Sequence, residues 1–200
     1  SIIRRAVIRY GGREYSENWR AVIRLNNVSP TLENITFADN WCNAVEIVGG
    51  EWTTKSWSNT TVVYWLGGDV TVKAANTLTI APGVRIKAGS NTSLYVNGKL
   101  LADGTQATPI IFTSVRDDTV CGVGAANEPV CDTNNDGAGT ATVGEWGWIE
   151  FGSSADANSI IRRAVIRYGG REYSENWRAV IRLNNVSPTL ENITFADNWC

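Results

Sequence analysis

Histidine and methionine are absent from the 200 residues, and neither charge sign predominates, with 18 Lys and Arg against 20 Asp and Glu. Without histidine, the chain cannot assemble a Ser-His-Asp or Cys-His catalytic unit, an imidazole zinc site or a histidine pH switch. The balanced charge argues against nucleic acid as a partner, because nucleic-acid-binding domains carry a clear basic excess or stripe. No apolar run reaches the roughly 18 residues of a transmembrane helix, so we expect no membrane span.

The chain contains a long internal repeat. Residues 1–42 and 159–200 are identical at all 42 positions, with an offset of 158. A repeat kept only for its fold would have drifted, because hydrophobic patterning tolerates many substitutions. We therefore interpret residues 1–158 as one full unit of a tandem array and residues 159–200 as the start of the next, continuous with the first. The alternative is a complete protein with a duplicated terminal segment.

Short β-type segments dominate each period. Most have three to five residues, are rich in Val, Ile, Thr and aromatics, and are separated by Gly, Asn, Pro and Asp. No segment keeps a 3.6-residue apolar period, so we expect almost no helix. Strands this short fit a sandwich or a solenoid, and the repeat favours the solenoid, because open ends let the next copy stack.

Residues 77–112 predict which side chains face inward. Pro82-Gly83, Asn97-Gly98 and Asp103-Gly104 have the composition of corners, where glycine supplies a positive φ. Alternation along the segments between these corners points Thr79, Arg85, Tyr95 and Ile111 outward. The same alternation places nine apolar side chains inside, namely Leu78, Ile80, Val84, Ile86, Leu94, Val96, Leu100, Ile110 and Phe112.

Three runs carry a resemblance to a known family. They are T-L-T-I-A-P-G-V-R-I-K-A-G (77–89), L-Y-V-N-G-K-L-L-A-D-G-T (94–105) and P-I-I-F-T-S (109–114). They resemble right-handed parallel β-helix (β-solenoid) repeat proteins of bacterial cell surfaces and secretions, and the resemblance is weakest over residues 50–60. It implies an all-β, three-sided coil. Counting triplets of the short segments gives about five rungs per 158-residue period, which would rise roughly 24 Å.

The long insertion at residues 114–144 contains a cation-binding motif. Residues 132–137, D-T-N-N-D-G, match the first six positions of a D-x-[DN]-x-[DN]-G calcium loop, although Val143 replaces the glutamate expected at the twelfth. In the similar β-helix proteins a T-S-x-x-D-D segment, here residues 113–118, accompanies such a loop. The resemblance therefore implies Ca²⁺ bound by Asp117, Asp118, Asp132, Asn134 and Asp136. The alternative is a solvated, Asx-rich turn.

Two cysteines, Cys121 and Cys131, lie ten positions apart in the same insertion. A disulfide between them would hold a loop that lacks its own core, and it would indicate an oxidising compartment. Zinc is disfavoured by the spacing and the absence of histidine. Cys42, repeated as Cys200, is expected to be a buried thiol at a rung corner, with an inter-chain disulfide as the alternative.

These features favour a structural role over catalysis. We expect a segment of a long bacterial extracellular or cell-surface filament, stalk or adhesin shaft, not an enzyme, stabilised by calcium and a disulfide. Neither terminus shows a cap, so the expected partners are further copies of itself, by tandem continuation or end-to-end stacking. Glycans are also expected partners, because exposed Trp and Tyr stack on sugar rings.

Two alternatives keep carbohydrate chemistry open. One is a carbohydrate-active β-helix enzyme, such as a polysaccharide lyase or hydrolase, which would use outward-facing Arg9, Arg24, Glu33 and Glu46. The other is a glycan-binding module, which a glycan array would separate from a passive shaft. An enzyme needs one differentiated cleft, and a tandem array of identical units does not require one.

Overall fold

A computed structural model describes residues 1–12, 21–171 and 179–199, and over these residues the fold is all-β. No helix in these ranges is long and apolar enough to cross a membrane. The strands are β1 (Ile2–Arg9), β2 (Ile23–Leu25), β3 (Thr31–Ala38), β4 (Val45–Ile47), β5 (Gly50–Trp52), β6 (Lys55–Trp57), β7 (Val63–Leu66), β8 (Val70–Val72), β9 (Thr77–Ile80), β10 (Arg85–Ala88), β11 (Leu94–Val96), β12 (Lys99–Asp103), β13 (Ile110–Ser114), β14 (Gly122–Val123), β15 (Pro129–Val130), β16 (Ile149–Phe151), β17 (Ile160–Arg167), β18 (Ile181–Leu183) and β19 (Thr189–Ala196).

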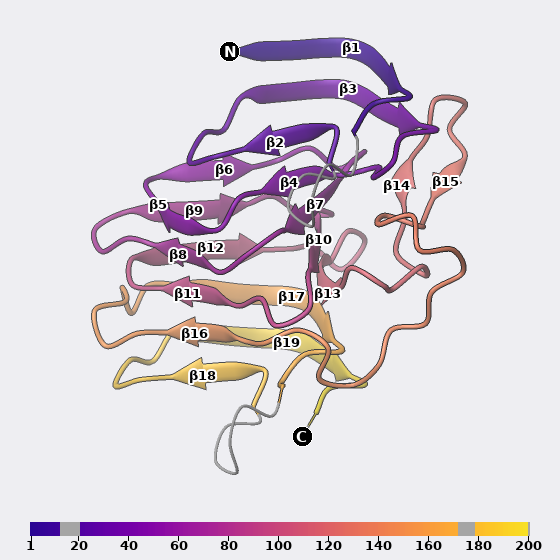
Figure 1. The fold of residues 1–200 in the computed structure, drawn as a ribbon. Coiled ribbons are helices and arrows are strands. Elements are labelled where there is room, and N and C mark those ends of the chain that lie inside the picture. The colour runs from indigo at the N-terminus through magenta and orange to yellow at the C-terminus, as the bar shows by residue number, and fades with distance from the viewer. Residues whose placement is uncertain (13–20, 172–178, 200) are drawn as a thin grey trace.

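The strands wind into a right-handed parallel β-helix, which confirms the predicted fold class (Figure 1). Each of the coils β4-β5-β6, β7-β8-β9 and β10-β11-β12 pairs in parallel with the next. Cα partners in adjacent coils lie one turn apart in sequence: Val63 pairs with Arg85 and Leu78 with Leu100, a spacing of 22 residues in both cases. Short strands with frequent corners therefore stack their backbone hydrogen bonds coil on coil.

The strand β17 joins two faces of the coil. Its first half pairs with β12 and its second half with β13, and between them Arg163 has a φ of 48°. That left-handed residue bends the strand around a corner of the coil. The same bend occurs at Arg5 in β1, where φ is 50°. β1 pairs with β3 in the register in which β17 pairs with β19, so the two copies of the repeat adopt the same local structure.

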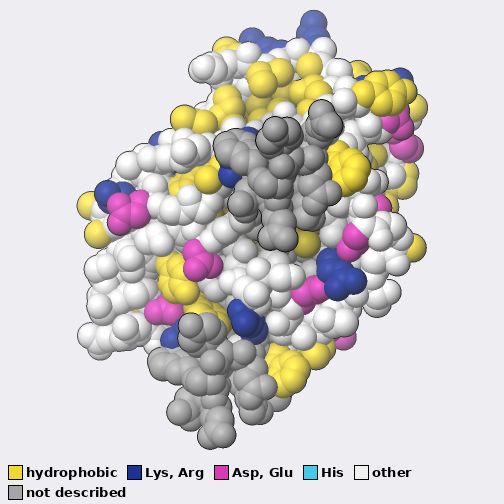
Figure 2. All heavy atoms as spheres, in the orientation of Figure 1, with side chains coloured by type: hydrophobic (Ala, Val, Ile, Leu, Met, Phe, Trp, Pro, Cys, Tyr) yellow, Lys and Arg dark blue, Asp and Glu magenta, His cyan; other side chains and the backbone are white. Residues whose placement is uncertain are grey.

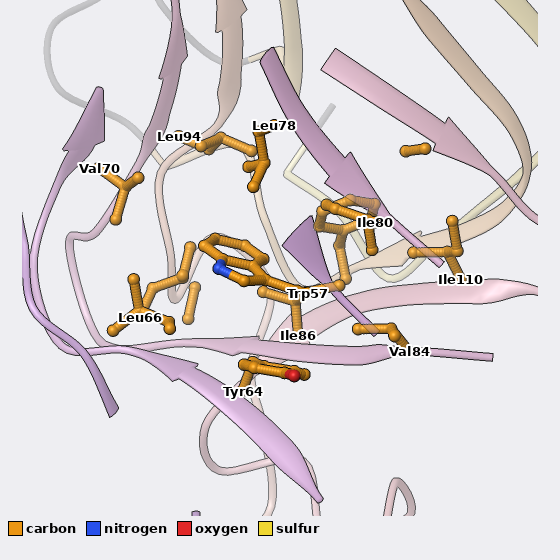
Figure 3. Close-up of a cluster of buried hydrophobic side chains, with 14 of the residues drawn as sticks. Trp57, Tyr64, Leu66, Val70, Leu78, Ile80, Val84, Ile86, Leu94 and Ile110 are labelled. Atoms are coloured by element: carbon orange, nitrogen blue, oxygen red, sulfur yellow. The ribbon is translucent and has the colours of Figure 1, made fainter. Parts of the chain in front are cut away.

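The interior of the coil is a continuous apolar core. All nine side chains predicted to face inward are at most 2% exposed, and the four predicted to face outward are partly exposed. Trp57 stacks on Tyr64 with ring centroids 5.7 Å apart and fills the coil beside Ile80 and Ile86 (Figure 3). The segment with the weakest resemblance, residues 50–60, thus supplies large aromatic side chains to the same core.

One long excursion leaves the coil between β13 and β16. Residues 115–148 contain the antiparallel hairpin of β14 and β15, which lies beside the coil (Figure 1). Lys87 on β10 follows inward-facing Ile86, so its side chain projects from the outer face, yet it is 0% exposed. Its partner on β13, Thr113, is also 0% exposed. The excursion therefore covers the outer face of β10 and β13.

Candidate functional sites: an acidic cluster and a groove

The excursion holds three carboxylates together, and we call Asp118, Asp132 and Asp136 the acidic cluster. One carboxylate oxygen of each lies within 4.8 Å of the others. Asp132 Oδ2 accepts the backbone N–H of Gly137 at 3.0 Å, which closes the turn, and Gly137 has a φ of 84°. Asp118 Oδ2 accepts the backbone N–H of Gly139 at 2.8 Å. This bond brings the segment after β13 onto the turn.

The acidic cluster fits a hard divalent cation. Asp118 Oδ1 and Asn134 Oδ1 are buried and have no hydrogen-bond partner among the described residues. Burial, reinforced by Asp132 and Asp136, raises the pKa of the Asp118 carboxyl above its ordinary value. Calcium binds six to eight oxygens from carboxylates, amides, carbonyls and water, so these oxygens match its preferred donors. The residues that would hold it are Asp118, Asp132, Asn134 and Asp136.

Asp117 was also predicted as a ligand, but the structure places its carboxylate outside the acidic cluster. Its Oδ2 accepts the Thr113 hydroxyl at 2.5 Å and lies 2.6 Å from Arg167 Nη2, while Oδ1 accepts the Thr119 hydroxyl at 2.7 Å. Burial alone would raise its pKa, but these hydrogen bonds and the guanidinium lower it overall. Asp117 therefore ties the excursion to β13 and β17 as a buried carboxylate, and only Asp118 reaches the turn.

Lys87 is a component of this region that the sequence did not reveal. Its Nζ donates to the carbonyl of Cys131 at 2.8 Å. Burial lowers the pKa of Lys87 to about 8, although Asp118, Asp117 and Asp132 act in the opposite direction. A second cation, Arg116, lies with Nε 3.3 Å from Asp136 Oδ2. Both cations offset the negative charge of the acidic cluster, and only the docking of the excursion brings Lys87 there.

A disulfide and a buried thiol stabilise the same part of the excursion. Cys121 and Cys131 form a disulfide across the base of the β14–β15 hairpin. Cys42 is a buried thiol in the corner between β3 and β4, and its Sγ donates to the carbonyl of Thr133 at 2.7 Å. Cys200, its copy, lies outside the described residues. The turn that carries the acidic cluster is thus fixed to the coil by contacts with Cys42 and Lys87.

A second candidate site is a groove on another face of the coil, formed by β8, β11, β16 and β18. Inward-facing apolar residues alternate with outward-facing Thr71, Tyr95, Glu150 and Arg182, which are in register from strand to strand. The groove has a volume of about 440 Å³. We call it the Tyr95 groove, and its lining includes Asp69, Asn91, Ser93, Tyr95, Trp148 and Arg182.

The polar groups of the Tyr95 groove are held in place by one another. Arg182 Nη1 lies 3.0 Å from Glu150 Oε2, and its guanidinium carbon lies 4.5 Å from the ring centroid of Trp148. Asp69 Oδ1 accepts the backbone N–H of Ser93 at 2.8 Å. Burial, then the charge of Asp69, raises the pKa of the Tyr95 hydroxyl, which therefore stays neutral and able to donate. The groove combines an aromatic wall with fixed donors and acceptors.

The residues proposed for the enzyme alternative do not converge. Glu46 pairs with Arg24 at 3.0 Å, Glu33 pairs with Arg4 at 2.7 Å, and Arg9 is exposed. On the face in Figure 2 basic and acidic side chains are interspersed rather than gathered. The Arg4–Glu33 pair is an ordinary exposed surface pair, whereas Glu46 is buried at 4% exposure and its charge is paired with Arg24.

Comparison with known proteins gives one family. The model of the pectate-lyase-like β-helix domain matches residues 50–182, about two thirds of the chain. No curated protein and no solved structure matches. The match corrects the expectation that the chain is not an enzyme, because members of this family are typically carbohydrate-active enzymes. The tandem repeat argued for a passive shaft, but it leaves room for a differentiated groove within each period.

Proposed function

Because the chain belongs to the pectate-lyase-like β-helix family, we propose that it is an extracellular, carbohydrate-active solenoid domain that binds polysaccharide in the Tyr95 groove. The observation that carries the proposal is the composition of this groove, where a half-buried tyrosine and a tryptophan lie among carboxylate, amide, hydroxyl and guanidinium groups. Ligand sites are concave, largely apolar or aromatic, and carry a few fixed polar groups that set orientation.

A sugar ring matches this combination chemically. Its C–H face packs on an aromatic side chain, and its hydroxyls both donate and accept hydrogen bonds. Within the groove Asp69 offers acceptors, Tyr95 a donor, and Arg182 a guanidinium fixed by Glu150. The outward-facing residues of these strands follow one another in register along the coil from β8 to β18. A linear polysaccharide lying along the axis would meet these strands in succession.

The test compares two tyrosines. Tyr95→Ser removes one aromatic side chain of the groove, and Tyr10→Ser removes a tyrosine that is 80% exposed and directly follows β1, at the end of the coil opposite β18. Binding to a panel of soluble polysaccharides, with release of new chain ends measured in the same reactions, is expected to fall about tenfold in Tyr95→Ser. Tyr10→Ser is expected to behave as wild type. Equal losses in both variants, or no polysaccharide bound by wild type, would contradict the proposal.

We also propose that calcium occupies the acidic cluster, with Asp118, Asp132, Asn134 and Asp136 as the side-chain ligands. The support is the pair of buried oxygens without hydrogen-bond partners together with the three converging carboxylates. Calcium would fasten the excursion to the coil and would supply positive charge there.

A second candidate function, a shaft or stalk on a bacterial surface, is favoured by the two copies of the repeat. Leu25, Leu32 and Phe37 are 5%, 7% and 3% exposed in the first copy. Their copies Leu183, Leu190 and Phe195 are 48%, 39% and 52% exposed. In the first copy the coils that follow cover these side chains. We infer that a further coil, continued in tandem or supplied by a second molecule, covers Leu183, Leu190 and Phe195.

Electron microscopy tests the proposal that the chain forms part of a shaft. Material with several tandem periods is expected to form thin, unbranched rods whose length grows in proportion to the number of periods. Compact particles that do not lengthen with added periods would contradict this second function without affecting the test of the Tyr95 groove.

A further inference from the structure

The charges of the Tyr95 groove indicate which class of polysaccharide it accepts. Among the described residues that line it, the charged ones are Asp69, Arg171 and Arg182. Arg182 is paired, because its Nη1 lies 3.0 Å from Oε2 of Glu150, its register partner on the neighbouring strand. Arg171 is not without a partner either. Both of these cations are therefore already engaged within the protein.

The pair of Glu150 and Arg182 is held in a partly buried setting. Their side chains are 21% and 18% exposed, and the guanidinium carbon of Arg182 lies 4.5 Å from the ring centroid of Trp148. Partial burial strengthens an ion pair, because less water screens it, and stacking on an aromatic ring restrains the planar guanidinium. An acidic ligand would therefore meet a neutral pair that contains a carboxylate, rather than a free guanidinium.

Asp69 supplies the remaining charge of the Tyr95 groove. Its Oδ1 accepts the backbone N–H of Ser93 at 2.8 Å, and the residue is exposed. No lysine or arginine of the described residues forms an ion pair with it. A carboxylate accepts hydrogen bonds from sugar hydroxyls, but it repels a second carboxylate. The unpaired charge that the groove presents to a ligand is thus negative.

The hydroxyl of Tyr95 experiences the same sign of charge. Burial is the largest cause of its raised pKa, and the negative charge of Asp69 is the next. A hydrogen bond with Ser93 lowers the pKa, Glu150 raises it, and Arg182 lowers it by the smallest amount of these. Since Asp69 and Glu150 together outweigh Arg182, the charged residues around this hydroxyl disfavour an anion there.

We propose that the Tyr95 groove selects polysaccharides of neutral sugars over polyuronates, and that Glu150 sets this preference by neutralising Arg182. The inference rests on the proposed function of the groove and names its substrate class. A neutral sugar donates its hydroxyls to Asp69 and packs its C–H face on Tyr95, whereas a uronate adds a carboxylate that finds no free cation. Pectate, in the name of the family, is itself a polyuronate, so this chain would differ from that name in its preference.

Calorimetry on the whole chain compares galactan with galacturonan, glucan with glucuronan, and mannan with mannuronan. Each pair contrasts a hydroxymethyl group with a carboxylate at C6. Wild type is expected to bind the neutral polymer of a pair about tenfold more tightly at low ionic strength, and the difference is expected to shrink as salt screens the repulsion.

Two results on wild type would overturn the inference while leaving the groove as a binding site. One is a polyuronate bound as tightly as its neutral counterpart, and the other is polyuronate binding that weakens as salt is added, which indicates attraction. Absence of binding by any of the six polymers would overturn the proposed function of the groove together with this inference.

Matched variants test the role of Glu150. Glu150→Gln keeps the size of the side chain and an acceptor for Arg182 but removes the negative charge. It is expected to raise the ratio of polyuronate affinity to neutral affinity about tenfold, because Arg182 then carries an uncompensated charge. Asp69→Asn, a change at an exposed residue, is expected to raise the same ratio, which keeps the test decisive if Glu150→Gln fails to fold.

Glu51→Gln is the control for these variants. Glu51 lies on β5 of the same face and pairs with Lys73 at 2.9 Å, and neither residue lines the groove. The ratio of affinities is expected to stay at the wild-type value in this variant. A merely structural role for Glu150 would weaken binding of both polymers together in Glu150→Gln. An unchanged ratio in that variant would therefore overturn the assignment of Glu150.

Discussion

Chelation of calcium is expected to release the excursion while leaving the coil intact. The acidic cluster places three carboxylate oxygens within 4.8 Å of one another. At that separation, with an effective dielectric constant of 20, each pair of unit charges repels by about 3.5 kcal/mol. Lys87 and Arg116 offset part of this repulsion, and a divalent cation would offset the rest. The coil does not depend on the cluster, because its core lies inside the stacked strands.

Release of the excursion is measured directly by hydrogen exchange with mass spectrometry, with and without chelator at fixed ionic strength. Protection is expected to fall across residues 115–148 and to persist in β7–β12. Asp132→Asn is expected to weaken calcium binding measured by calorimetry by about tenfold or more. Asp156→Asn, which removes an acid at a distant corner of the coil, is the matched control. Calcium uptake that is unchanged in Asp132→Asn, or absent at millimolar calcium, would refute the reasoning.

Three further predictions concern stability. Lys87 has a pKa of about 8 in the folded chain against 10.5 ordinarily, so folding favours its neutral form. Wild-type stability is therefore expected to rise by up to about 3 kcal/mol relative to Lys87→Met between about pH 8 and pH 10.5, as measured by urea unfolding of both proteins. Replacing Cys121 and Cys131 together by serine opens a short loop and is expected to cost the excursion about 3 kcal/mol, measured as faster proteolysis within it and an unchanged β signal. Phe112→Ala leaves a cavity inside the coil and is expected to cost about 3–5 kcal/mol, measured as a lower unfolding midpoint.

Each of these predictions has a clear contrary result. A Lys87→Met stability curve parallel to wild type above pH 8 would mean that Lys87 is not titrating in a buried environment. Unchanged proteolysis after loss of the disulfide would mean that coil contacts alone hold the excursion. A Phe112→Ala variant as stable as one with the outward-facing change Ile111→Ala would contradict the inside–outside assignment of β13.

The coil was predictable because its rules are local. Alternation within each short strand decides which side chains face inward, and Pro-Gly, Asn-Gly and Asp-Gly pairs mark the corners. Leu78, Ile86 and Phe112 needed no knowledge of distant residues to be placed. The burial of Lys87 and Thr113 required such knowledge, because both lie on the outer face of the coil and only the excursion covers that face.

The candidate sites were predictable only where one segment carried them. The turn at 132–137 is a local motif, so one segment is enough to bring Asp132 and Asp136 together. Asp117 and Asp118 are adjacent, and their directions depend on Arg167 and Gly139, which are distant in sequence. The Tyr95 groove draws on strands separated by more than a hundred residues. Sequence patterning showed that Tyr95 faces outward, but it gave no sign that Trp148 and Arg182 lie beside it.

The identical repeat and the differentiated groove are compatible because most of the groove comes from outside the repeated segment. Arg182 belongs to the repeated segment, whereas Glu150 on β16, with which it pairs, and Trp148, over which it lies, belong to the unique part of the period. The groove thus joins residues from the unique part of the period to one residue of the repeated segment. Under the proposed function, each added period supplies one further groove, and a longer shaft presents more of them along one axis. Its affinity for a long polysaccharide is then expected to rise more steeply than in proportion to the number of periods, because linked sites bind a single chain at high effective concentration.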